Sequence, residues 1–383
     1  MRAVGLMSGT SLDGIDAACL EIRPRGEGYA IELLHFLTVP FSEAVRERLR
    51  AALPPHAPAL GEIAALDASL GAAFGEAVRR VAGDVAPDYV ASHGLTLFHD
   101  GAAGASWQIG DPFAIRERAE ATVAYDFRRA DCAAGGQGAP LVPYVDALLF
   151  GGAERATVAL NLGGIANVTV IPPGARRDDV RGWDTGPANM LLDAFVRART
   201  GGTEAFDAGG AYARRGDVDA ALLELMLADP YFTLSPPKST GRERFGASFL
   251  YAHPALQALS LEDGCATLAA LSAESIARDL RREVRGGARV VVSGGGARNA
   301  ALLDALRERL GREFEIVTSD EAGVDPDAKE AVAFALLGYE LLRGRPAGLP
   351  AVTGARRPAL LGSLAPFELP KLLERVRVET GER

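Results

Sequence analysis

Cysteine is scarce in this sequence, and its spacing excludes several kinds of protein. The 383 residues include three cysteines and five histidines, and none of them stand in the paired spacing of a zinc site. Cys19, Cys132 and Cys265 are an odd number and lie far apart, so they do not outline a disulfide framework. No apolar N-terminal segment behind a basic region marks a signal peptide. The composition therefore predicts a reducing, cytoplasmic location.

Positive charge and long apolar runs are also limited. The formal net charge is −9, whereas a protein that binds nucleic acid needs a basic face for the phosphates. No apolar run reaches the length of a membrane span. We therefore expect neither a nucleic-acid partner nor a membrane. Any bound phosphate must be held by backbone N–H groups, a metal ion, or a few chosen arginine and lysine side chains.

A strand, a glycine-rich turn and a second strand follow one another at two places in the chain. The first copy has an apolar strand at residues 3–7 and a half-buried strand at 15–22; the second begins at residue 157, with Gly163 and Gly164 in its turn. Each copy leads into alternating helices and strands, as in α/β proteins. We expect two α/β domains, 1–155 and 156–383, around a central cleft, and the last helices could pack back on the first domain.

The first turn, GTSLDGID at residues 9–16, is a near match to a Walker phosphate loop. It has the Gly-x4-Gly spacing, but Ile15 and Asp16 stand where that motif needs Lys and Ser/Thr. A Walker loop also feeds a helix, whereas a strand pattern follows here. Successive N–H groups of a hairpin turn can hold an anion without a lysine, and glycines let the backbone approach it. We predict a phosphate-binding turn; the alternative is an ordinary hairpin of good turn formers.

Several longer motifs, in one order, resemble those of the anhydro-N-acetylmuramic acid kinases, from Gly5 to about Gly362. They are GLMSGTSLDGID, ASHG, QIGDP, DFR, GGQGAPLVP, NLGGIANVT, DTGPAN, DPYF, PKSTGRE, SGGGARN and VTGA. The resemblance implies the duplicated ribonuclease-H-like (actin-like ATPase) fold, ATP with Mg²⁺, a homodimer, and a role in recycling cell-wall peptidoglycan. The reaction it implies cleaves the 1,6-anhydro ring with water and phosphorylates the freed O6, giving N-acetylmuramic acid 6-phosphate.

The glycine turns are the expected ATP site. With the resemblance, the first turn contributes Gly9, Thr10, Ser11, Leu12, Asp13, Gly14, Ile15 and Asp16, and the second contributes Gly163, Gly164 and Asn167. The glycine run after a later apolar strand is interpreted as the adenosine site, with Gly294, Gly295, Gly296 and Arg298. Mg²⁺ prefers carboxylate, water and phosphate oxygens. We assign it to Asp13, because Asp16 lies in the return strand, where it could merely face solvent or cap a turn. Asp16 is a nearly equal alternative.

Asp184, in the string WDTGP, is the candidate catalytic base. The residues alone leave two interpretations open. Asp184 stands at the end of a predicted strand, and Pro187 suits the first turn of a following helix, so Asp184 or Thr185 could merely cap that helix. The resemblance instead implies that this aspartate deprotonates the water that attacks the anomeric carbon.

The expected sugar contacts are His93, Gln108, Asp111, Arg128 and Glu330. The lactyl carboxylate of N-acetylmuramate suits the fork of an arginine, for which Arg128 is the candidate. An ion pair of Arg128 with Asp126 or Asp131 is the alternative. Lys238 could contact the substrate or only shape its loop. Leu95 stands where the family usually has Gln, which puts one sugar contact in question.

Two rival functions remain compatible with the motifs. One is another kinase of the same superfamily, a phosphotransferase acting on the alcohol group of a different sugar or on a carboxylate. The other is a non-catalytic sensor that closes on nucleotide and sugar without phosphoryl transfer. The carboxylate at position 184 favours an enzyme, because a pure sensor has no need of a base there.

Overall fold

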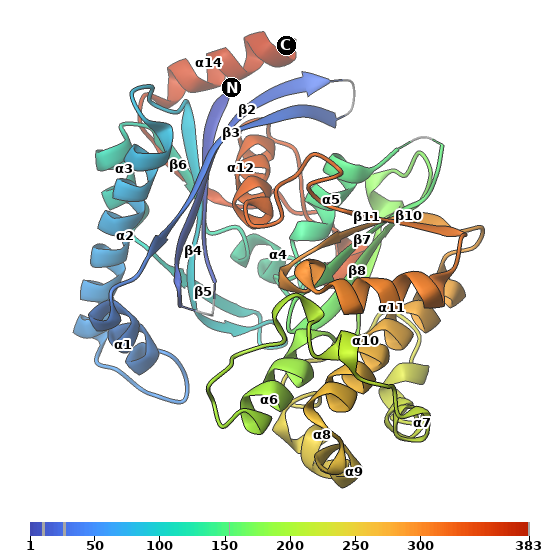
Figure 1. Cartoon of the computed structure of the whole chain (residues 1–383). Helices are drawn as coiled ribbons and strands as arrows, with labels where there is room; N and C mark the ends of the chain where they lie inside the picture. Colours follow the sequence, from blue (N-terminus) through green and yellow to red (C-terminus); the bar gives the residue numbers. More distant parts are fainter. Residues whose placement is uncertain (10–11, 26–27, 153, 382–383) are drawn as a thin grey trace. The chain divides into compact units, whose positions relative to one another are not determined.

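The computed structural model describes residues 1–9, 12–25, 28–152 and 154–381 of the chain. These residues form two compact units. Unit 1 comprises Met1–Leu149 together with Asp327–Arg383, and unit 2 comprises Phe150–Pro326. The C-terminal segment thus belongs with the N-terminal strands: the amino group of Met1 lies 3.1 Å from the carboxylate of Glu379. Each unit is described by itself below (Figure 1).

Unit 1 is built on a mixed sheet in the order β12-β6-β4-β1-β2-β3, with β5 paired to β4. The strands β1 and β2 are antiparallel, as are β2 and β3, whereas β4 is parallel to β1 and β6 is parallel to β4. The bounds are β1 (Arg2–Ser8), β2 (Gly14–Arg25), β3 (Gly28–Pro40), β4 (Tyr89–Asp100), β5 (Ala105–Ile109), β6 (Thr122–Tyr125) and β12 (Ser363–Ala365).

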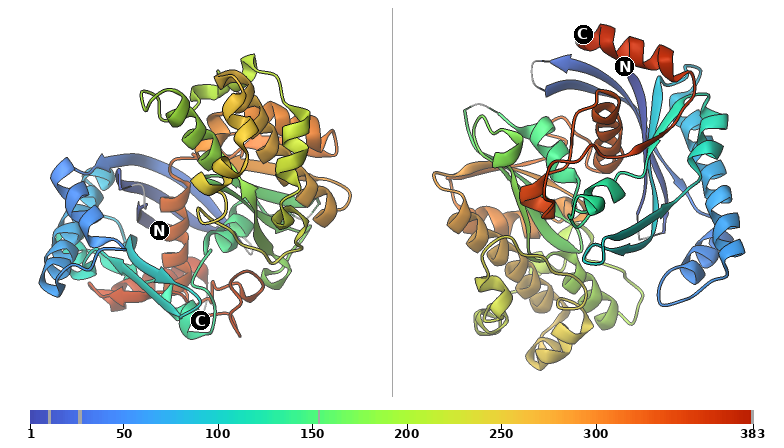
Figure 2. Two further views of the ribbon diagram at one scale, coloured as in Figure 1. Left: turned by 90° about the horizontal axis from the view of Figure 1, so that it is seen from below. Right: turned by 180° about the vertical axis from the view of Figure 1, so that it is seen from behind.

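Helices cover both faces of this sheet. Successive side chains of its central strands point to opposite faces, and both faces are apolar. Val4 and Leu6 pack in one cluster with α1, α2 and α3, and Ala3 packs in another with α12 and α14. Figures 1 and 2 show α1, α2 and α3 on one side of the strands and α12 on the other. The helices are α1 (Glu43–Ala52), α2 (Leu60–Ala82), α3 (Pro112–Ala119), α4 (Arg129–Ala133), α5 (Val142–Phe150), α12 (Lys329–Leu342), α13 (Pro350–Thr353) and α14 (Leu369–Thr380).

Unit 2 has a five-stranded sheet in the order β11-β10-β7-β8-β9. Its strands are β7 (Thr157–Leu162), β8 (Ile165–Ile171), β9 (Arg181–Pro187), β10 (Ala288–Ser293) and β11 (Phe314–Thr318). Helices α10 (Leu261–Glu283) and α11 (Ala300–Leu310) share a core cluster with the sheet. A second cluster joins the first half of α10 to α6 (Asn189–Arg199), α7 (Ala220–Leu227), α8 (Ala247–Ala252) and α9 (Pro254–Ala258). Short 3-10 turns, among them η4 (Pro230–Thr233) and η5 (Gly295–Arg298), complete the unit.

The two sheets repeat one topology. In unit 2, β7 pairs antiparallel with β8 and β8 with β9, whereas β10 is parallel to β7 and to β11. The series β9-β8-β7-β10-β11 therefore matches β3-β2-β1-β4-β6 in order and direction. This is the ribonuclease-H-like arrangement, and its duplication confirms the predicted fold class. Along the described part of the chain, no helix is both long enough and apolar enough to cross a membrane.

Candidate functional site

The first glycine turn joins two antiparallel strands, as predicted, and no helix follows it. Thr10 and Ser11 lie outside the described residues. Leu12 has a φ of 59°, in the left-handed region, and its N–H donates to the carbonyl oxygen of Gly9 at 3.2 Å. The Ser8 hydroxyl donates to the carbonyl oxygen of Gly14 at 2.8 Å. A left-handed residue within a tight turn is the backbone pattern that aims successive N–H groups at an anion.

Carboxylates gather beside this turn in unit 1. Asp16 is half-buried on β2 and accepts a hydrogen bond from the Thr38 hydroxyl at 2.6 Å. Burial raises the pKa of Asp16, and the charges of Asp13 and Asp327 raise it further. Glu330, at the start of α12, is exposed to solvent at its surface. The protein around its carboxyl group, and then the charge of Asp16, raise the pKa of Glu330. Asp327 is a member of this group that the sequence motifs did not indicate.

His93 on β4 and Arg128, which precedes α4, are hydrogen-bonded to each other in the same unit. The Arg128 Nε–H donates to His93 Nε2 at 3.0 Å, and Nη1 donates to the carbonyl oxygen of Gly138 at 2.9 Å. The remaining ring nitrogen of His93, Nδ1, lies 3.0 Å from the carbonyl oxygen of Gly94. Since Nε2 accepts, the proton must be on Nδ1. Burial, with the Arg128 charge added, holds the pKa of His93 well below its usual range, so the ring is neutral.

The alternative ion pairs of Arg128 are wrong. Asp126 instead pairs with Arg129. Asp131 is fully buried and accepts hydrogen bonds from the Thr353 hydroxyl and from the N–H of Gly138, both at 2.8 Å. Arg128 directly precedes α4. Within the described chain, no carboxylate lies within ion-pairing distance of its guanidinium.

Gln108 and Asp111 lie on β5 and just before α3. The Gln108 amide nitrogen donates to the hydroxyls of Thr96 and Ser106, at 3.2 and 2.9 Å. Its oxygen Oε1 is buried and has no hydrogen-bond partner in the described part of the chain, which is uncommon for a buried polar atom. Asp111 is the N-cap of α3 and accepts from the N–H of Phe113 at 2.9 Å. A structural role for Asp111 is therefore established, whereas its sugar contact stays a prediction.

Unit 2 carries a row of polar residues across three strands. Asn161 on β7 pairs with Asn167 on β8, and Asn167 pairs with Asp184 on β9. Directly opposed residues of neighbouring strands share one face of a sheet, so the two amides and the carboxylate lie side by side. Ser293, the last residue of β10, pairs with Asn161 on its other flank. The row places the candidate base beside the second glycine turn.

The other glycine motifs of unit 2 converge on this row. A Cβ at Gly294, whose φ is 81°, would lie 2.5 Å from Asn161 Oδ1, and one at Gly296 would lie 2.7 Å from the Leu162 Cβ. The turn carbonyls of Gly163 and Gly164 accept hydrogen bonds from the first N–H groups of α6 and from the residue before it. The two motifs assigned to nucleotide thus lie together, because only glycine permits this close approach. Arg298 ends the short η5 turn.

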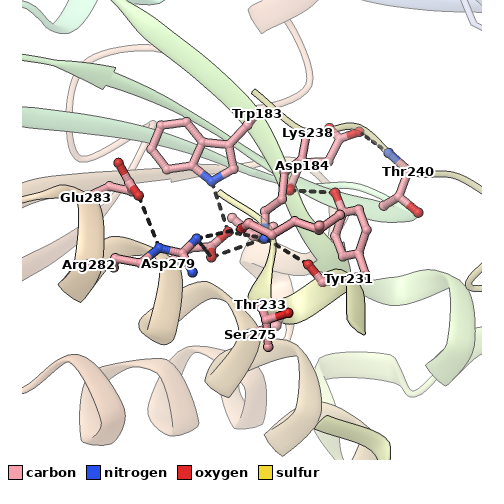
Figure 3. A network of polar contacts seen from close by, with 12 residues as sticks. Trp183, Asp184, Tyr231, Thr233, Lys238, Thr240, Ser275, Asp279, Arg282 and Glu283 are labelled. Atoms are coloured by element: carbon pink, nitrogen blue, oxygen red, sulfur yellow. Dashed lines mark hydrogen bonds and ion pairs between the residues drawn. The ribbon is translucent and has the colours of Figure 1, made fainter. Parts of the chain in front are cut away.

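Asp184 is held inside β9 and is not a helix cap. Pro187 is the last residue of that strand, and α6 begins at Asn189 after Ala188, so the helix-cap interpretation and the helical start at Pro187 are both wrong. Asp184 Oδ2 accepts hydrogen bonds from the Ser239 hydroxyl and the Thr240 N–H, both at 2.9 Å. No hydrogen bond within the described chain reaches Oδ1. Figure 3 shows this carboxylate among its neighbours.

The surroundings of Asp184 suit a base. Burial raises the pKa of its carboxyl; hydrogen bonds from Thr240 and Ser239 and the charge of Lys238 counteract that effect, whereas Glu243 adds to it. A raised pKa brings a carboxylate closer to the range in which it accepts protons effectively. Ser239 and Thr240 were not predicted as site residues, although they lie in the quoted PKSTGRE motif. The Thr240 hydroxyl oxygen is buried and unpartnered among the described residues.

The described residues contain no metal site formed by protein side chains alone. Within them, no group of three or more His, Cys, Asp and Glu side chains lies close enough to hold a metal ion by itself. Mg²⁺ in phosphoryl-transfer sites is bound through one or two carboxylates together with waters and phosphate oxygens. Asp13 and Asp16 fit this requirement, because the Asp13 charge acts on Asp16 and Asp13 is exposed.

These features define the class of the protein: a duplicated ribonuclease-H-like α/β chain with a glycine turn in each unit and a held carboxylate in the second. The family model for anhydro-N-acetylmuramic acid kinase matches residues 1–367. An anhydro-N-acetylmuramic acid kinase of Streptomyces coelicolor is 44% identical over 97% of this chain and 95% of its own length. An anhydro-N-acetylmuramic acid kinase of Xanthomonas campestris pv. campestris is 45% identical over 95% of this chain and 97% of its own length. The chain belongs to the anhydro-N-acetylmuramic acid kinase family.

Solved structures resemble the chain more distantly. An activator of the 2-hydroxyisocaproyl-CoA dehydratase from Clostridium difficile aligns over 88% of this chain and 93% of its own, with 15% identity and a TM-score of 0.42. This similarity is too low to carry weight. The fold assignment rests on the strand order of the two units and on the family match.

Proposed function

We propose that this protein is an ATP-dependent kinase that opens the 1,6-anhydro ring of 1,6-anhydro-N-acetylmuramic acid with water and phosphorylates O6. The product is N-acetylmuramic acid 6-phosphate, and the role is peptidoglycan recycling. Family membership supports the substrate and the reaction class. The observation that carries the chemistry is the Asp184 carboxylate, which is held by two donors on Oδ2 while Oδ1 has no hydrogen-bond partner within the described chain.

In this proposal Asp184 takes a proton from the attacking water. The water oxygen forms a bond to C1 of the sugar, the C1–O6 bond breaks, and O6 keeps the electron pair. O6 then takes the γ-phosphoryl group, and ADP leaves. The donors on Asp184 Oδ2 fix the carboxylate and leave Oδ1 to accept the proton. Preorganised donors of this kind cost no rearrangement during the reaction.

The glycine turns are assigned to ATP. The N–H groups of the first turn, residues 9–16, and those at Gly163, Gly164 and Asn167 would hold the phosphates, and Gly294–Gly296 with Arg298 would hold the adenosine. When bound, Mg²⁺ neutralises charge on the phosphates during transfer. Asp13 and Asp16 are the residues that would hold it. Asp16 is the better supported of the two, because β2 and the hydrogen bond from Thr38 fix its carboxylate. Burial and then the charges of Asp13 and Asp327 raise its pKa, and a bound cation would lower it.

The sugar contacts are assigned to His93, Gln108, Arg128 and Glu330, with Asp111 retained as a candidate. Arg128 is the only one of these that carries a positive charge, since His93 is neutral. The hydrogen bonds from Nε and Nη1 orient the guanidinium, so its remaining N–H groups would face the lactyl carboxylate. An oriented fork loses less entropy on binding than a free side chain. We also expect a cytoplasmic homodimer, and light scattering coupled to size exclusion would test the dimer.

The test is ADP release with and without 1,6-anhydro-N-acetylmuramic acid, followed by mass spectrometry of the sugar. The expected product is heavier than the substrate by one water and one phosphoryl group. Sugar-dependent ADP release with a product heavier by a phosphoryl group alone would indicate another kinase of the superfamily. ATP binding without turnover on any sugar would indicate a sensor. Either outcome would contradict the proposed reaction.

A further inference from the structure

A buried ion pair lies next to the candidate base in unit 2. Lys238 Nζ is 2.9 Å from Asp279 Oδ2, and the two side chains are 2% and 1% exposed. Asp279 is on α10, and Lys238 is in the loop between η4 and α8. The substrate-contact interpretation of Lys238 is therefore wrong for the side chain, because its ammonium group is enclosed by protein. Figure 3 shows the pair between β9 and α10.

The Asp279 carboxylate is fully occupied. Besides Lys238, the Trp183 indole N–H donates to Oδ2 at 3.0 Å, and the Arg282 guanidinium donates to Oδ1 at 2.8 Å. Lys238 Nζ also lies 4.7 Å from the ring centroid of Tyr231, a cation–π distance. The buried charges of Lys238 and Asp279 therefore each have a partner of opposite charge, as burial of an ion pair requires.

The pair is joined to Asp184 from both sides along the backbone. Trp183 directly precedes Asp184 on β9, and Lys238 directly precedes Ser239 and Thr240, the two donors to Asp184 Oδ2. The Lys238 carbonyl oxygen accepts the N–H of Asp184 at 3.1 Å. The Asp279 carboxylate thus holds, through the side chains of Trp183 and Lys238, both segments that meet at the base.

Stability alone gives little reason to keep such a pair. Replacing a buried ion pair with apolar residues of similar volume is often neutral or stabilising, whereas a charged pair with fixed partners can specify one arrangement. The loop around Lys238 has no helix or strand of its own between residues 234 and 246. A fixed anchor is what a loop of this kind needs if it is to present two donors to one carboxylate oxygen.

We propose that Lys238 and Asp279 are positioning residues that hold the loop donors, and through them the Asp184 carboxylate, in the geometry needed for proton transfer. The inference rests on the proposed function of Asp184 as the base. The pair acts through Ser239 and Thr240 and touches no substrate. The positive charge of Lys238 also lowers the pKa of Asp184, against the opposing charge of Glu243, so the pair influences both the place and the protonation of the base.

The experiment compares Lys238→Met, the double variant Lys238→Met/Asp279→Asn and a matched control, Arg309→Met. Arg309 also pairs with a carboxylate of α10, at 3.3 Å from Glu274, and neither this partner nor Glu308 belongs to the Asp184 loop. Each protein is assayed for kcat, for KM of ATP and of sugar, and for the acid limb of kcat/KM against pH. Thermal unfolding checks the fold. The double variant removes both charges of the pair, so it leaves no unpaired lysine or aspartate and guards against simple misfolding.

The expected result for Lys238→Met is a fall in kcat of about 10²-fold, the effect of misplacing a catalytic group by about 1 Å. Both KM values should stay within about twofold. The acid limb should move to higher pH, because losing the Lys238 charge raises the pKa of Asp184 and the base is active only when deprotonated. The double variant should keep the low kcat while unfolding at a temperature near that of the wild type. Arg309→Met should behave as wild type.

A folded double variant with wild-type kcat and an unmoved acid limb would overturn the positioning role. The proposed function fails separately, if the wild-type chain turns over no anhydro sugar. In that case a titration of ¹³C-labelled aspartate carboxyls, with Asp184 assigned through Asp184→Asn, still decides the inference. An unchanged pKa of Asp184 in Lys238→Met contradicts it, and a raised pKa supports it.

Discussion

Replacing Asp184 with asparagine separates the chemistry of the site from its structure. The amide oxygen of the introduced asparagine can accept the same two hydrogen bonds, from the Ser239 hydroxyl and the Thr240 N–H, that Oδ2 accepts at 2.9 Å. The local geometry should therefore persist. What disappears is the ability to take a proton. General base catalysis contributes about 10² to 10⁴-fold, so kcat should fall by that factor while ATP and sugar still bind.

The same substitution should not destabilise unit 2. The pKa of Asp184 is raised in the folded chain, so its ionisation favours the unfolded state. At pH values above the pKa that Asp184 has in the folded chain, its ionised carboxyl therefore lowers the free energy of unfolding. This destabilisation disappears as the pH falls through the lower pKa that Asp184 has in the unfolded chain. A neutral asparagine avoids the cost, and Asp184→Asn should unfold at the same or a higher temperature than wild type at neutral pH.

Kinetics and calorimetry test both expectations. kcat is measured by coupled ADP release, binding of ATP and sugar by isothermal titration calorimetry, and unfolding by differential scanning calorimetry. Asp304→Asn is the control, since Asp304 is a surface carboxylate paired with Arg214 and Arg307, and its kcat should match wild type. Wild-type turnover by Asp184→Asn would refute the base assignment. Lost binding together with a lowered unfolding temperature would refute the claim that the amide preserves the geometry.

Three further predictions concern unit 1. Arg128→Lys should raise KM for the sugar about tenfold with kcat little changed, because one ammonium group replaces an oriented fork; steady-state kinetics at saturating ATP would measure this. Asp16→Asn should raise the Mg²⁺ concentration needed for half-maximal activity more than Asp13→Asn does, and the reverse order in a Mg²⁺ titration would reassign the metal to Asp13. Gly5→Ala should lower the free energy of unfolding by about 3 kcal/mol, since its Cβ would lie 1.8 Å from a carbonyl oxygen of α12. Gly61→Ala, whose Cβ meets nothing within 4 Å, is the control in the same denaturant titrations, and equal stability of the two variants would contradict this packing argument.

Much of the fold could be predicted from the sequence, because the deciding signals are local. The apolar alternation on both sides of a glycine turn predicts a hairpin at β1–β2 and again at β7–β8, and the structure confirms both. The repeated pattern predicts duplication. The absence of a helix pattern after residue 16 separates the first turn from a Walker loop. Each of these inferences depends on residues within about one turn or strand of one another.

The site could be predicted only in part. The motif indicates Asp184, but the residues alone do not separate a base from a helix cap, since Asp suits both. The structure excludes the helix cap, because β9 continues past Asp184 to Pro187. The role of Asp184 as a base stays a prediction. The residues alone also left Arg128 with two possible ion-pair partners, because two aspartates lie within three positions of it. Only the folded chain shows that Asp126 and Asp131 are engaged elsewhere.

The sequence by itself determined the two strand–turn–strand segments and the glycine turns between their strands. Tertiary structure alone decided that Asp327–Arg383 joins unit 1, that Asn161, Asn167 and Asp184 form one row, and that Lys238 pairs with Asp279. The physical reason is the range of the interactions. Hairpins and turns follow from neighbours in sequence, whereas Lys238 and Asp279 are 41 positions apart. Their pairing depends on how α10 packs against the sheet, a property of the whole core rather than of either segment.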